Sequence, residues 1–272
     1  MKIFLNEKEV EVDETITAYK LRVLMKKEAD VVVYNGFIIK EDVDLKENDN
    51  VMLIKKGEVP RREELEALMA ARHTPFVHEK LKKYKVGIAG LGGLGSNAAV
   101  SLARIGIGKL VLVDFDVVEP SNLNRQQYFV RHIGMKKTEA LKEIIEECNP
   151  FVEVEAIDLF LNKDNIYETF KDVDIIVEAF DNPEYKALLV NVVLKELKDK
   201  KLITASGMAG YFSSNTIKTK KIKDNFYIVG DEVSEARPGC GLMAPRVAIA
   251  ANHEANAVVR IILGEEAWDK NI

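Results

Sequence analysis

The stretch that decides the fold runs from Val86 to Asn97 and reads Val-Gly-Ile-Ala-Gly-Leu-Gly-Gly-Leu-Gly-Ser-Asn. Its apolar start, Val86 to Ala89, is typical of a buried strand, and a helical pattern begins at Ser96. Between strand and helix lies a Gly-x-Gly-x-x-Gly motif with one extra glycine: Gly90, Gly92, Gly93 and Gly95. In this context the backbone approaches a phosphate closely, and the free N–H groups of the helix N-terminus bind it. A tight strand-to-helix turn without a ligand is the alternative, and the strand–glycine–helix context favours the phosphate site.

Strand and helix patterns alternate along the chain from Tyr84 onward. A long helix from about Arg246 to Leu263 is expected to close this region at Gly264, with Arg246 in a surface or interface role. The alternation predicts an α/β fold with a Rossmann-like, mostly parallel sheet and helices on both faces. The expected strands are Val86 to Ala89, Leu110 to Val113, Val152 to Ile157, Val173 to Val177 and Leu202 to Ala205.

Residues 1–57 follow a different order, with strands, then one helix, then strands. The tight-turn dipeptide Asn35-Gly36 lies between the later strands. The expected strands are Lys2 to Leu5, Val10 to Val12, Val31 to Tyr34 and Val51 to Ile54, and the helix carries Ala18, Leu21, Leu24 and Met25 on one face. This order predicts a small α+β β-grasp domain. Residues 58–82 are charged with apolar residues at helical spacing and are expected to form a helical linker, which leaves residues 83–272 for the α/β domain.

The composition excludes several classes of protein. Of 272 residues, 47% are hydrophobic and 31% charged, which is typical of a soluble globular protein. The net charge of −5 argues against a broad surface for nucleic acid or anionic membrane. The two cysteines, Cys148 and Cys240, lack zinc-site spacing, so no zinc is expected. No apolar run has the length of a membrane span and the N-terminus does not read as a signal peptide, so we expect a cytoplasmic protein.

A polar loop follows the second expected strand of the α/β region. Asp114 ends that strand, where a carboxylate accepts hydrogen bonds from ribose hydroxyls, although a solvated acid at a strand end is the alternative. The glycines and Asp114 alone are compatible with NAD or with ATP. The loop favours ATP, because a triphosphate requires cations and fixed donors as charge develops on its oxygens. The candidate nucleotide-binding residues of the loop are Asp116, Asn122, Arg125 and Gln126.

Two further charged residues are candidates for the same site. Lys137 offers a mobile point charge to phosphates, although Lys136 and Lys137 would also fit a solvated helix face. Asp181 follows an apolar strand at its C-terminal end, where open α/β sheets bind ligands, and is a candidate Mg²⁺ ligand. Asp181-Asn182-Pro183 is also a good helix start, so an N-cap is the competing interpretation, and the two roles do not exclude each other.

The ordered set of motifs resembles the ThiF/MoeB family, the bacterial relatives of ubiquitin-activating enzymes, over roughly residues 60–264. Pro238 to Arg246 resembles a shorter, zinc-free ThiF branch, and residues 1–57 resemble ThiS, the ubiquitin-like sulfur carrier. The motifs that carry the resemblance are Gly90 to Gly95, Asp114-Phe115-Asp116, Ser121 to Gln126, Lys137 and Phe180-Asp181-Asn182.

The resemblance implies an ATP-dependent adenylyltransferase that activates the C-terminal carboxylate of a ThiS-like sulfur carrier for thiamine thiazole biosynthesis. By matching residues, Asp114 is implied to hold the ribose, Arg125 and Lys137 the phosphates, and Asp181 the Mg²⁺. The resemblance also implies a homodimer in which an arginine from an N-terminal helix enters the partner's site, and Arg72 is the candidate.

The carrier-like segment has no Gly-Gly tail, because Gly57 continues directly into Glu58. The substrate carrier is therefore expected in trans, and the fused segment is expected to dock, to regulate or occlude the site, or to be inactive.

Cys240, between two glycines, is a candidate thiol for sulfur transfer, with a structural role as its alternative. A non-catalytic nucleotide-binding regulatory protein and an enzyme that adenylates a tRNA-base carboxylate stay open. The Asn122–Gln126 loop argues against an NAD-dependent oxidoreductase.

Overall fold

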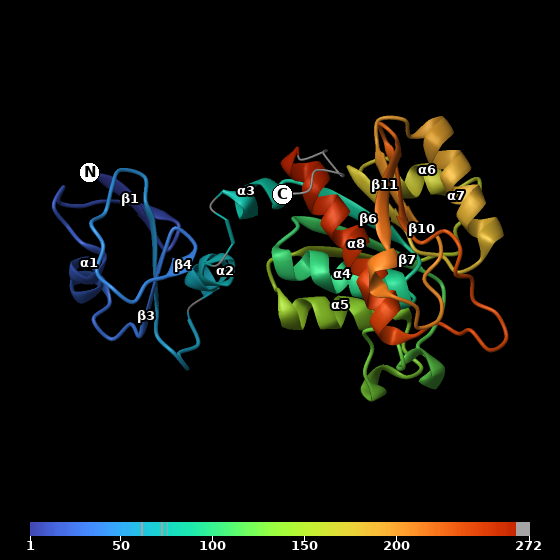
Figure 1. The fold of residues 1–272 in the computed structure, drawn as a ribbon, viewed down its shortest axis with the longest axis horizontal. Helices are drawn as coiled ribbons and strands as arrows, with labels where there is room; N and C mark the ends of the chain where they lie inside the picture. Colours follow the sequence, from blue (N-terminus) through green and yellow to red (C-terminus); the bar gives the residue numbers. More distant parts are fainter. Residues whose placement is uncertain (61, 72, 75, 265–272) are drawn as a thin grey trace. The chain divides into compact units, whose positions relative to one another are not determined.

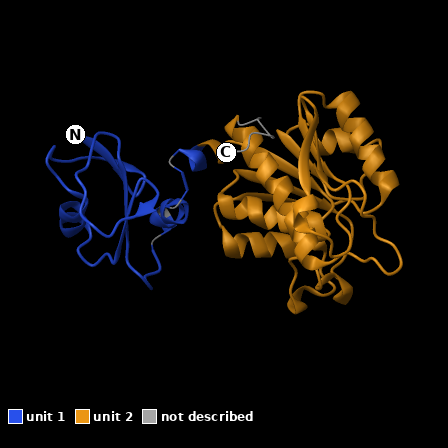
Figure 2. Cartoon of the chain, viewed as in Figure 1, with its two compact units in different colours: residues 1–79 blue, residues 80–272 orange. Residues whose placement is uncertain are grey.

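The chain divides into two compact units in a computed structural model, Met1–Glu79 and Lys80–Ile272 (Figure 2). The structure describes residues 1–60, 62–71, 73–74 and 76–264, without the side chain of Glu63. Residues 58–79, which we expected to belong to a linker, lie within the first unit.

The first unit contains a five-stranded sheet in the order β2-β1-β5-β3-β4. The central pair, β1 and β5, is parallel, and the other neighbours are antiparallel. The sheet and its helix α1 have the order of elements expected for residues 1–57. The strands are β1 (Lys2–Leu5), β2 (Lys8–Glu11), β3 (Val31–Tyr34), β4 (Phe37–Ile38) and β5 (Asn50–Ile54), and the helix is α1 (Ala18–Met25).

Helix α1 covers one face of this sheet. Thr17 caps the helix by accepting a hydrogen bond from the Lys20 N–H, and Ala18 and Leu21 are buried. Leu24, expected on the same face, is 73% exposed, and Met25 is also exposed. Leu24 lies about 120° around the helix from Ala18, and Met25 is the last residue of the helix. Of the four residues expected on the apolar face, only Ala18 and Leu21 are therefore buried.

The other face of the same sheet is covered by chain from the expected linker. Alternation along β3 and β5 points Val33 and Met52 away from α1, where they pack against Ala71. Ala71 directly follows helix α2 (Arg62–Ala70). A Cβ on Gly36 would lie 3.0 Å from the carbonyl oxygen of His73, so the backbone approaches the sheet closely here. Residues after β5 therefore form a second layer on the β-grasp sheet.

The second unit contains a seven-stranded sheet in the order β11-β12-β10-β9-β6-β7-β8. Six strands are parallel, and the edge strand β11 is antiparallel to β12, so the predicted mostly parallel sheet is confirmed. The strands are β6 (Lys85–Ala89), β7 (Lys109–Asp114), β8 (Glu153–Asp158), β9 (Ile175–Glu178), β10 (Lys201–Ala205), β11 (Lys218–Lys223) and β12 (Phe226–Gly230).

Helices cover both faces of the larger sheet (Figure 1). The helices α4, α5 and α8 lie on one side, where α8 packs along α4, and α6 and α7 lie on the other side. Short helix α3 (Val77–Leu81) precedes β6 in the chain. The bounds are α4 (Gly93–Ile105), α5 (Lys137–Cys148), α6 (Ile166–Phe170), α7 (Pro183–Glu196) and α8 (Ala244–Leu263).

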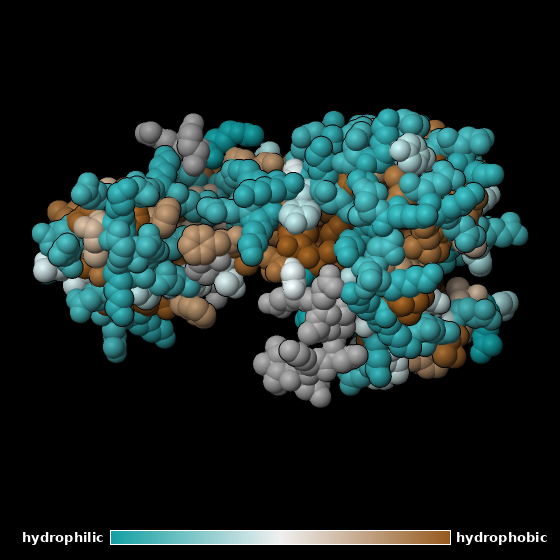
Figure 3. Space-filling view, turned by 90° about the horizontal axis from the view of Figure 1, so that it is seen from above, coloured by the Kyte–Doolittle hydropathy of each residue, from teal (hydrophilic) through white to brown (hydrophobic). Residues whose placement is uncertain are grey.

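Hydrophilic residues make up most of the visible surface of each unit (Figure 3). Buried aliphatic side chains of β6, β7, β9 and β10 form the core together with α6 and α7. In the ranges that the structure describes, no helix is both long enough and apolar enough to cross a membrane.

Candidate functional site

The glycine turn joins β6 to α4 at the C-terminal edge of the sheet. Gly90 has a φ of +89°, which favours glycine, and a Cβ there would meet Phe180 and Ala179. A Cβ on Gly95 would lie 1.9 Å from the carbonyl oxygen of Gly90, so only glycine fits. Helix α4 begins at Gly93, and its first N–H groups have no partner within the helix. The turn thus presents backbone donors at a helix N-terminus, as the sequence predicted.

Asp114, the last residue of β7, connects the glycine turn to the polar loop that follows it. Its Oδ2 accepts a hydrogen bond from the Leu91 N–H at 2.6 Å, and its Oδ1 accepts one from the Asp116 N–H at 2.8 Å. These bonds fix the orientation of the carboxylate. Asp114 is therefore part of the loop framework as well as a candidate ribose ligand.

A cavity of about 520 Å³ opens beside the glycine turn. This volume lies in the usual range for small-molecule sites, about 300–1,000 Å³. Almost all predicted nucleotide-site residues line it, and Gly95 is instead packed behind the turn. The predicted residues that line the cavity are Gly90, Gly92, Gly93, Asp114, Asp116, Asn122, Arg125, Gln126, Lys137 and Asp181.

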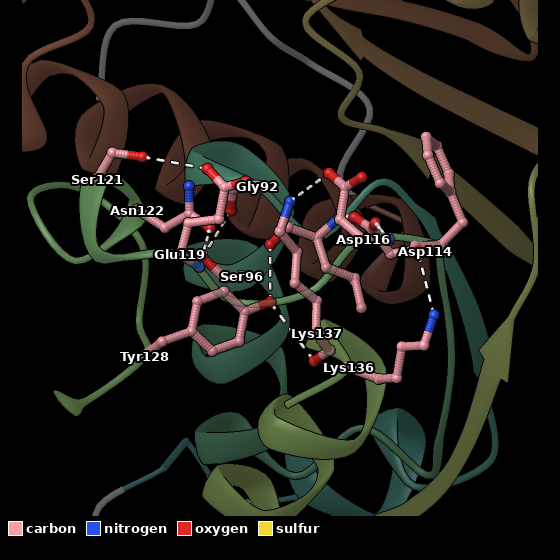
Figure 4. A network of polar contacts seen from close by, with 12 residues as sticks. Gly92, Ser96, Asp114, Asp116, Glu119, Ser121, Asn122, Tyr128, Lys136 and Lys137 are labelled. Carbon is pink, nitrogen blue, oxygen red and sulfur yellow. Dashed lines mark hydrogen bonds and ion pairs between the residues drawn. The ribbon is translucent and has the colours of Figure 1, made fainter. Parts of the chain in front are cut away.

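The loop that carries Arg125 is held by its own polar contacts. Asn122 is buried and accepts a hydrogen bond from the Glu119 N–H at 3.0 Å (Figure 4). Asn97 of α4 donates to the Arg125 carbonyl at 3.1 Å. Arg125 Nη1 donates to Asn124 Oδ1 at 2.8 Å. Within the described part of the chain, neither Arg125 Nε nor Gln126 Oε1 has a hydrogen-bond partner, although both atoms are buried. Arg125 and Gln126 both line the cavity, which therefore has polar groups for a polar ligand.

The structure distinguishes Lys137 from Lys136. Lys137 begins α5 with only 7% of its side chain exposed, and its Nζ lies 2.7 Å from Asp116 Oδ2 (Figure 4). Lys136 instead contacts Asp158 at 3.1 Å and does not line the cavity. The solvated helix face that we considered for both lysines therefore does not describe Lys137.

Asp181 lies in the turn between β9 and α7. The N-cap of α7 is Asn182, whose Oδ1 accepts hydrogen bonds from the Glu184 and Tyr185 N–H groups. The capping role is therefore filled by the neighbour, and the Asp181 carboxyl lines the cavity. No group of three His, Cys, Asp or Glu side chains suited to a metal occurs among the described residues.

Sequence reasoning missed an aromatic row beside the cavity. The Phe160 ring packs edge-on against Phe115, with centroids 5.0 Å apart, and against Tyr185, with centroids 5.3 Å apart. All three residues line the cavity. Phe115, Phe160 and Tyr185 come after the C-terminal ends of β7, β8 and β9. Their position after parallel strands was the only signal in the sequence for a place near the cavity.

A buried charged cluster beside the cavity was also missed. Glu178, the last residue of β9, is fully buried, and its Oε2 accepts a hydrogen bond of 2.5 Å from Lys186 Nζ. Glu254 of α8 is also fully buried, and neither of its carboxylate oxygens has a hydrogen-bond partner among the described residues. Burial raises the pKa of both carboxyls, and the charge of Glu178 raises the pKa of Glu254 further.

Arg246 is buried at the start of α8, so the expected surface or interface role is wrong. Its guanidinium joins residues 212–216 to Asp231, and three of its four acceptor residues line a neighbouring cavity. Its acceptors are the Phe212 and Ser213 carbonyl oxygens, Thr216 Oγ1 and Asp231 Oδ2.

Besides Gly95, two predicted catalytic residues, Cys240 and Arg72, are not among those that line this cavity. Cys240 lies in a second cavity, which shares Ser234 and Glu235 with the first. Backbone hydrogen bonds in both directions between Cys240 and Arg237 hold this thiol in a tight turn. Arg72 lies outside the described residues. The structure therefore gathers the predicted nucleotide residues and leaves the predicted thiol in a neighbouring cavity.

The ThiF family matches residues 66–271, and a ThiS-like ubiquitin family matches residues 1–57. The chain belongs to the ThiF family. The predicted family and the predicted domain types are thereby confirmed.

Relatives of this ThiF-family chain include proteins named for different activities. The adenylyltransferase and sulfurtransferase UBA4 of Candida glabrata is 30% identical over 192 residues, which cover 68% of this chain and 44% of that protein. The tRNA threonylcarbamoyladenosine dehydratase of Bacillus subtilis is 39% identical over 134 residues, which cover 48% of this chain and 52% of that protein. The matched regions thus span about half the length of these relatives.

The fold of the ThiF-family unit recurs in solved structures. The Escherichia coli tRNA N6-threonylcarbamoyladenosine dehydratase in complex with ATP has a TM-score of 0.65 and 23% sequence identity. The likeness covers 74% of this chain and 95% of that one. At this identity the likeness supports the α/β fold.

Proposed function

We propose that this protein is an ATP-dependent adenylyltransferase that activates the C-terminal carboxylate of a ubiquitin-like sulfur carrier. The observation that carries the proposal is the cavity beside the glycine turn, which combines helix N-terminal donors with Arg125 and Lys137. Buried cationic and N–H donors of this kind are suited to a polyphosphate. The relatives named as adenylyltransferases support the same class of reaction.

The proposed reaction is a displacement at the α-phosphorus of ATP. A carboxylate oxygen of the carrier forms a bond to that phosphorus, the bond from the phosphorus to the bridging oxygen breaks, and pyrophosphate leaves. Asp114 holds the ribose, while Arg125 and Lys137 stabilise the charge that develops on the phosphate oxygens. Positioning and electrostatics dominate such a displacement, so the first step needs no nucleophile from the protein.

Asp181 is the residue that we assign to Mg²⁺. Mg²⁺ keeps several waters and typically binds one or two carboxylates together with substrate phosphates, so Asp181 alone is enough to hold this ion against the phosphates. When bound, Mg²⁺ supplies charge neutralisation to the phosphates. The contribution of the chain is to hold Asp181 at the end of β9, while Asn182 caps the helix that follows.

The substrate carrier acts in trans in this proposal. Gly57 of the ThiS-like unit is amide-linked to Glu58 and offers no free carboxylate. Both sides of this linkage are held, because the Lys56 N–H donates to Asp30 at 2.8 Å and Glu58 pairs with Lys26 at 2.8 Å.

The match of residues 1–57 to the ThiS-like family supports a role in thiamine thiazole biosynthesis. A homodimer with Arg72 in the partner's site and a thiol role for Cys240 stay predictions.

A second candidate function follows from the relatives named as tRNA threonylcarbamoyladenosine dehydratases. In that case the same nucleotide site would adenylate a carboxylate on a tRNA base. A nucleotide-binding regulatory protein without catalysis is the third candidate.

ATP–pyrophosphate exchange on the full chain separates the three functions. Exchange stimulated at least about tenfold by a carrier ending in Gly-Gly, and not by tRNA, supports the proposal. Exchange stimulated only by tRNA favours the second function. ATP binding without exchange under either condition favours the regulatory protein.

Because Ala71 packs on the sheet of the first unit, a fragment that lacks this unit should begin at residue 80 rather than at residue 58.

A further inference from the structure

Lys186 is a cationic side chain of the cavity that none of the assigned roles uses. It lies in the second turn of α7, lines the cavity, and has 25% of its side chain exposed. Its Nζ contacts Glu178 Oε2 at 2.5 Å. The other carboxylate oxygen of Glu178 accepts a hydrogen bond from the Phe180 N–H at 2.8 Å. Both oxygens of this buried carboxylate are therefore occupied, which fixes the ammonium at the end of β9.

The surroundings of Lys186 differ from those of the phosphate-binding groups. The glycine turn leads into α4 on one face of the sheet, whereas Lys186 belongs to α7 on the opposite face (Figure 1). On the α7 side the cavity is lined by apolar residues that pack on the core of α6 and α7, namely Leu159, Leu161 and Phe180. The ring of Tyr185, next to Lys186, packs against Phe160 on the same side.

This arrangement divides the cavity between the two halves of a nucleotide. Phosphates at the α4 N-terminus and a ribose at Asp114 leave the apolar side, next to α7, for the base. A purine ring packs well against apolar and aromatic side chains, and its ring nitrogens accept hydrogen bonds. A lysine ammonium has three N–H donors, and the contact with Glu178 uses one of them.

We propose that Lys186 donates a hydrogen bond to the adenosine half of the bound nucleotide and that Glu178 is the positioning residue for its ammonium. This contact rests on the proposed function, because it requires the cavity to bind ATP. It assigns Lys186 to nucleotide recognition, apart from the phosphate-binding roles of Arg125 and Lys137.

The alternative is that Lys186 affects ATP binding only by balancing the charge of the buried acids. An experiment must distinguish this effect from a direct hydrogen bond. Glu178 and Glu254 are both fully buried, and Lys186 is the cation that pairs with this cluster. Loss of the lysine would leave a buried acid without its cation beside the cavity, and ATP binding would weaken by charge repulsion without any direct contact. In that case Glu178→Gln would restore the binding that Lys186→Met had lost.

Calorimetric titration of the full chain with ATP and with AMP tests the contact. For Lys186→Met we expect about tenfold weaker binding of both nucleotides, because the contact is to the half that they share. The double variant Glu178→Gln/Lys186→Met should stay about tenfold weaker, since it restores charge balance without restoring the donor. Glu178→Gln alone should weaken both nucleotides about threefold. Lys195→Met, on the exposed face of the same helix, is the matched control and should bind as the wild type does.

Three results would overturn the contact while leaving the proposed function intact. These are unchanged affinities in Lys186→Met, weaker binding of ATP but not of AMP, and recovery of wild-type affinity in the double variant. Circular dichroism checks that each variant is folded. If Lys186→Met unfolds, Glu178→Gln, which keeps the lysine, still tests the positioning role. A wild-type protein that binds neither nucleotide overturns the nucleotide site and this contact together.

Discussion

Arg246 Nη2 lies 2.5 Å from Asp231 Oδ2, and this nearly buried ion pair joins the start of α8 to the segment that follows β12. Asp231 also accepts hydrogen bonds from the N–H groups of Val233 and Ser234. Burial alone would raise the pKa of Asp231, but a hydrogen bond from the Ser234 hydroxyl, these two N–H groups and the Arg246 charge together hold that pKa below its usual value. The pair therefore holds the wall segment that contains Ser234, which lines both the nucleotide cavity and its neighbour.

Replacing Arg246 by alanine should destabilise the second unit. The substitution leaves the Asp231 carboxylate nearly buried without its cation and removes the donor for two backbone carbonyls. We expect a loss of about 3–5 kcal/mol in the free energy of unfolding, measured by urea denaturation. Arg104→Ala, at an exposed position of α4, should change it by less than about 0.5 kcal/mol. A loss below about 1 kcal/mol in Arg246→Ala would show that the pair does not hold the wall.

Replacing Arg125 by alanine should impair catalysis more than folding. The cavity loses a guanidinium that stabilises charge on the phosphates, and we expect ATP–pyrophosphate exchange to fall at least about a hundredfold. Arg131→Ala is the control, since Arg131 is exposed and pairs with Glu147 at 3.0 Å. Near-wild-type exchange in a folded Arg125→Ala protein would refute the assigned role.

Replacing Gly95 by alanine should distort the glycine turn. The added Cβ would lie 1.9 Å from the Gly90 carbonyl oxygen, so the backbone must move. We expect a cost of about 1–3 kcal/mol in stability and at least tenfold weaker ATP binding, measured by denaturation and calorimetry. Gly241→Ala, where a Cβ meets nothing within 4 Å, should be neutral. Unchanged ATP affinity in Gly95→Ala would contradict the close approach.

Replacing Glu254 by glutamine should change how stability depends on pH. The folded protein holds the Glu254 carboxyl protonated to higher pH than the unfolded chain does, because burial, and then Glu178, raise its pKa. The unfolded chain therefore binds fewer protons above the ordinary value of about 4.3, and this group lowers wild-type stability as pH rises from there toward its folded pKa. The variant should gain stability relative to wild type between pH 5 and pH 7.

Urea denaturation of both proteins at several pH values measures this difference. Glu196→Gln, at an exposed position of α7, is the control and should show no such trend. A difference between Glu254→Gln and wild type that stays constant with pH would contradict the prediction. Glu178 and Lys186 are the charged groups that act on Glu254, and both remain in the variant.

The parts of the structure that sequence predicted are those with strong local signals. The expected strands of the α/β region are apolar runs or, at Val152 to Ile157, alternate apolar residues with charged ones, and both patterns are local signals for strands. The glycine turn has a spacing typical of a phosphate-binding strand-to-helix turn. Asp114, Arg125 and Asp181 could be placed because side chains after parallel strands converge at one edge of the sheet. These features depend on residues close together in sequence.

The parts that sequence missed depend on tertiary contacts. Strand β11 carries four lysines in six residues and has the composition of a solvated segment, yet it pairs with β12 as an edge strand. Glu178 and Glu254 are 76 positions apart, so no local pattern links them. Arg246 looked like a surface residue because its acceptors lie 15 to 34 positions away.

The packing of Ala71 against Val33 and Met52 has a consequence for the fused architecture. The polypeptide beyond β5 cannot shield this sheet and also reach outward as a flexible reactive arm. The covering residues therefore make residues 1–57 a fixed part of a larger unit. Releasing them as a separate protein with a free C-terminus would require a polar sheet surface at Val33 and Met52 in addition to a cut after Gly57.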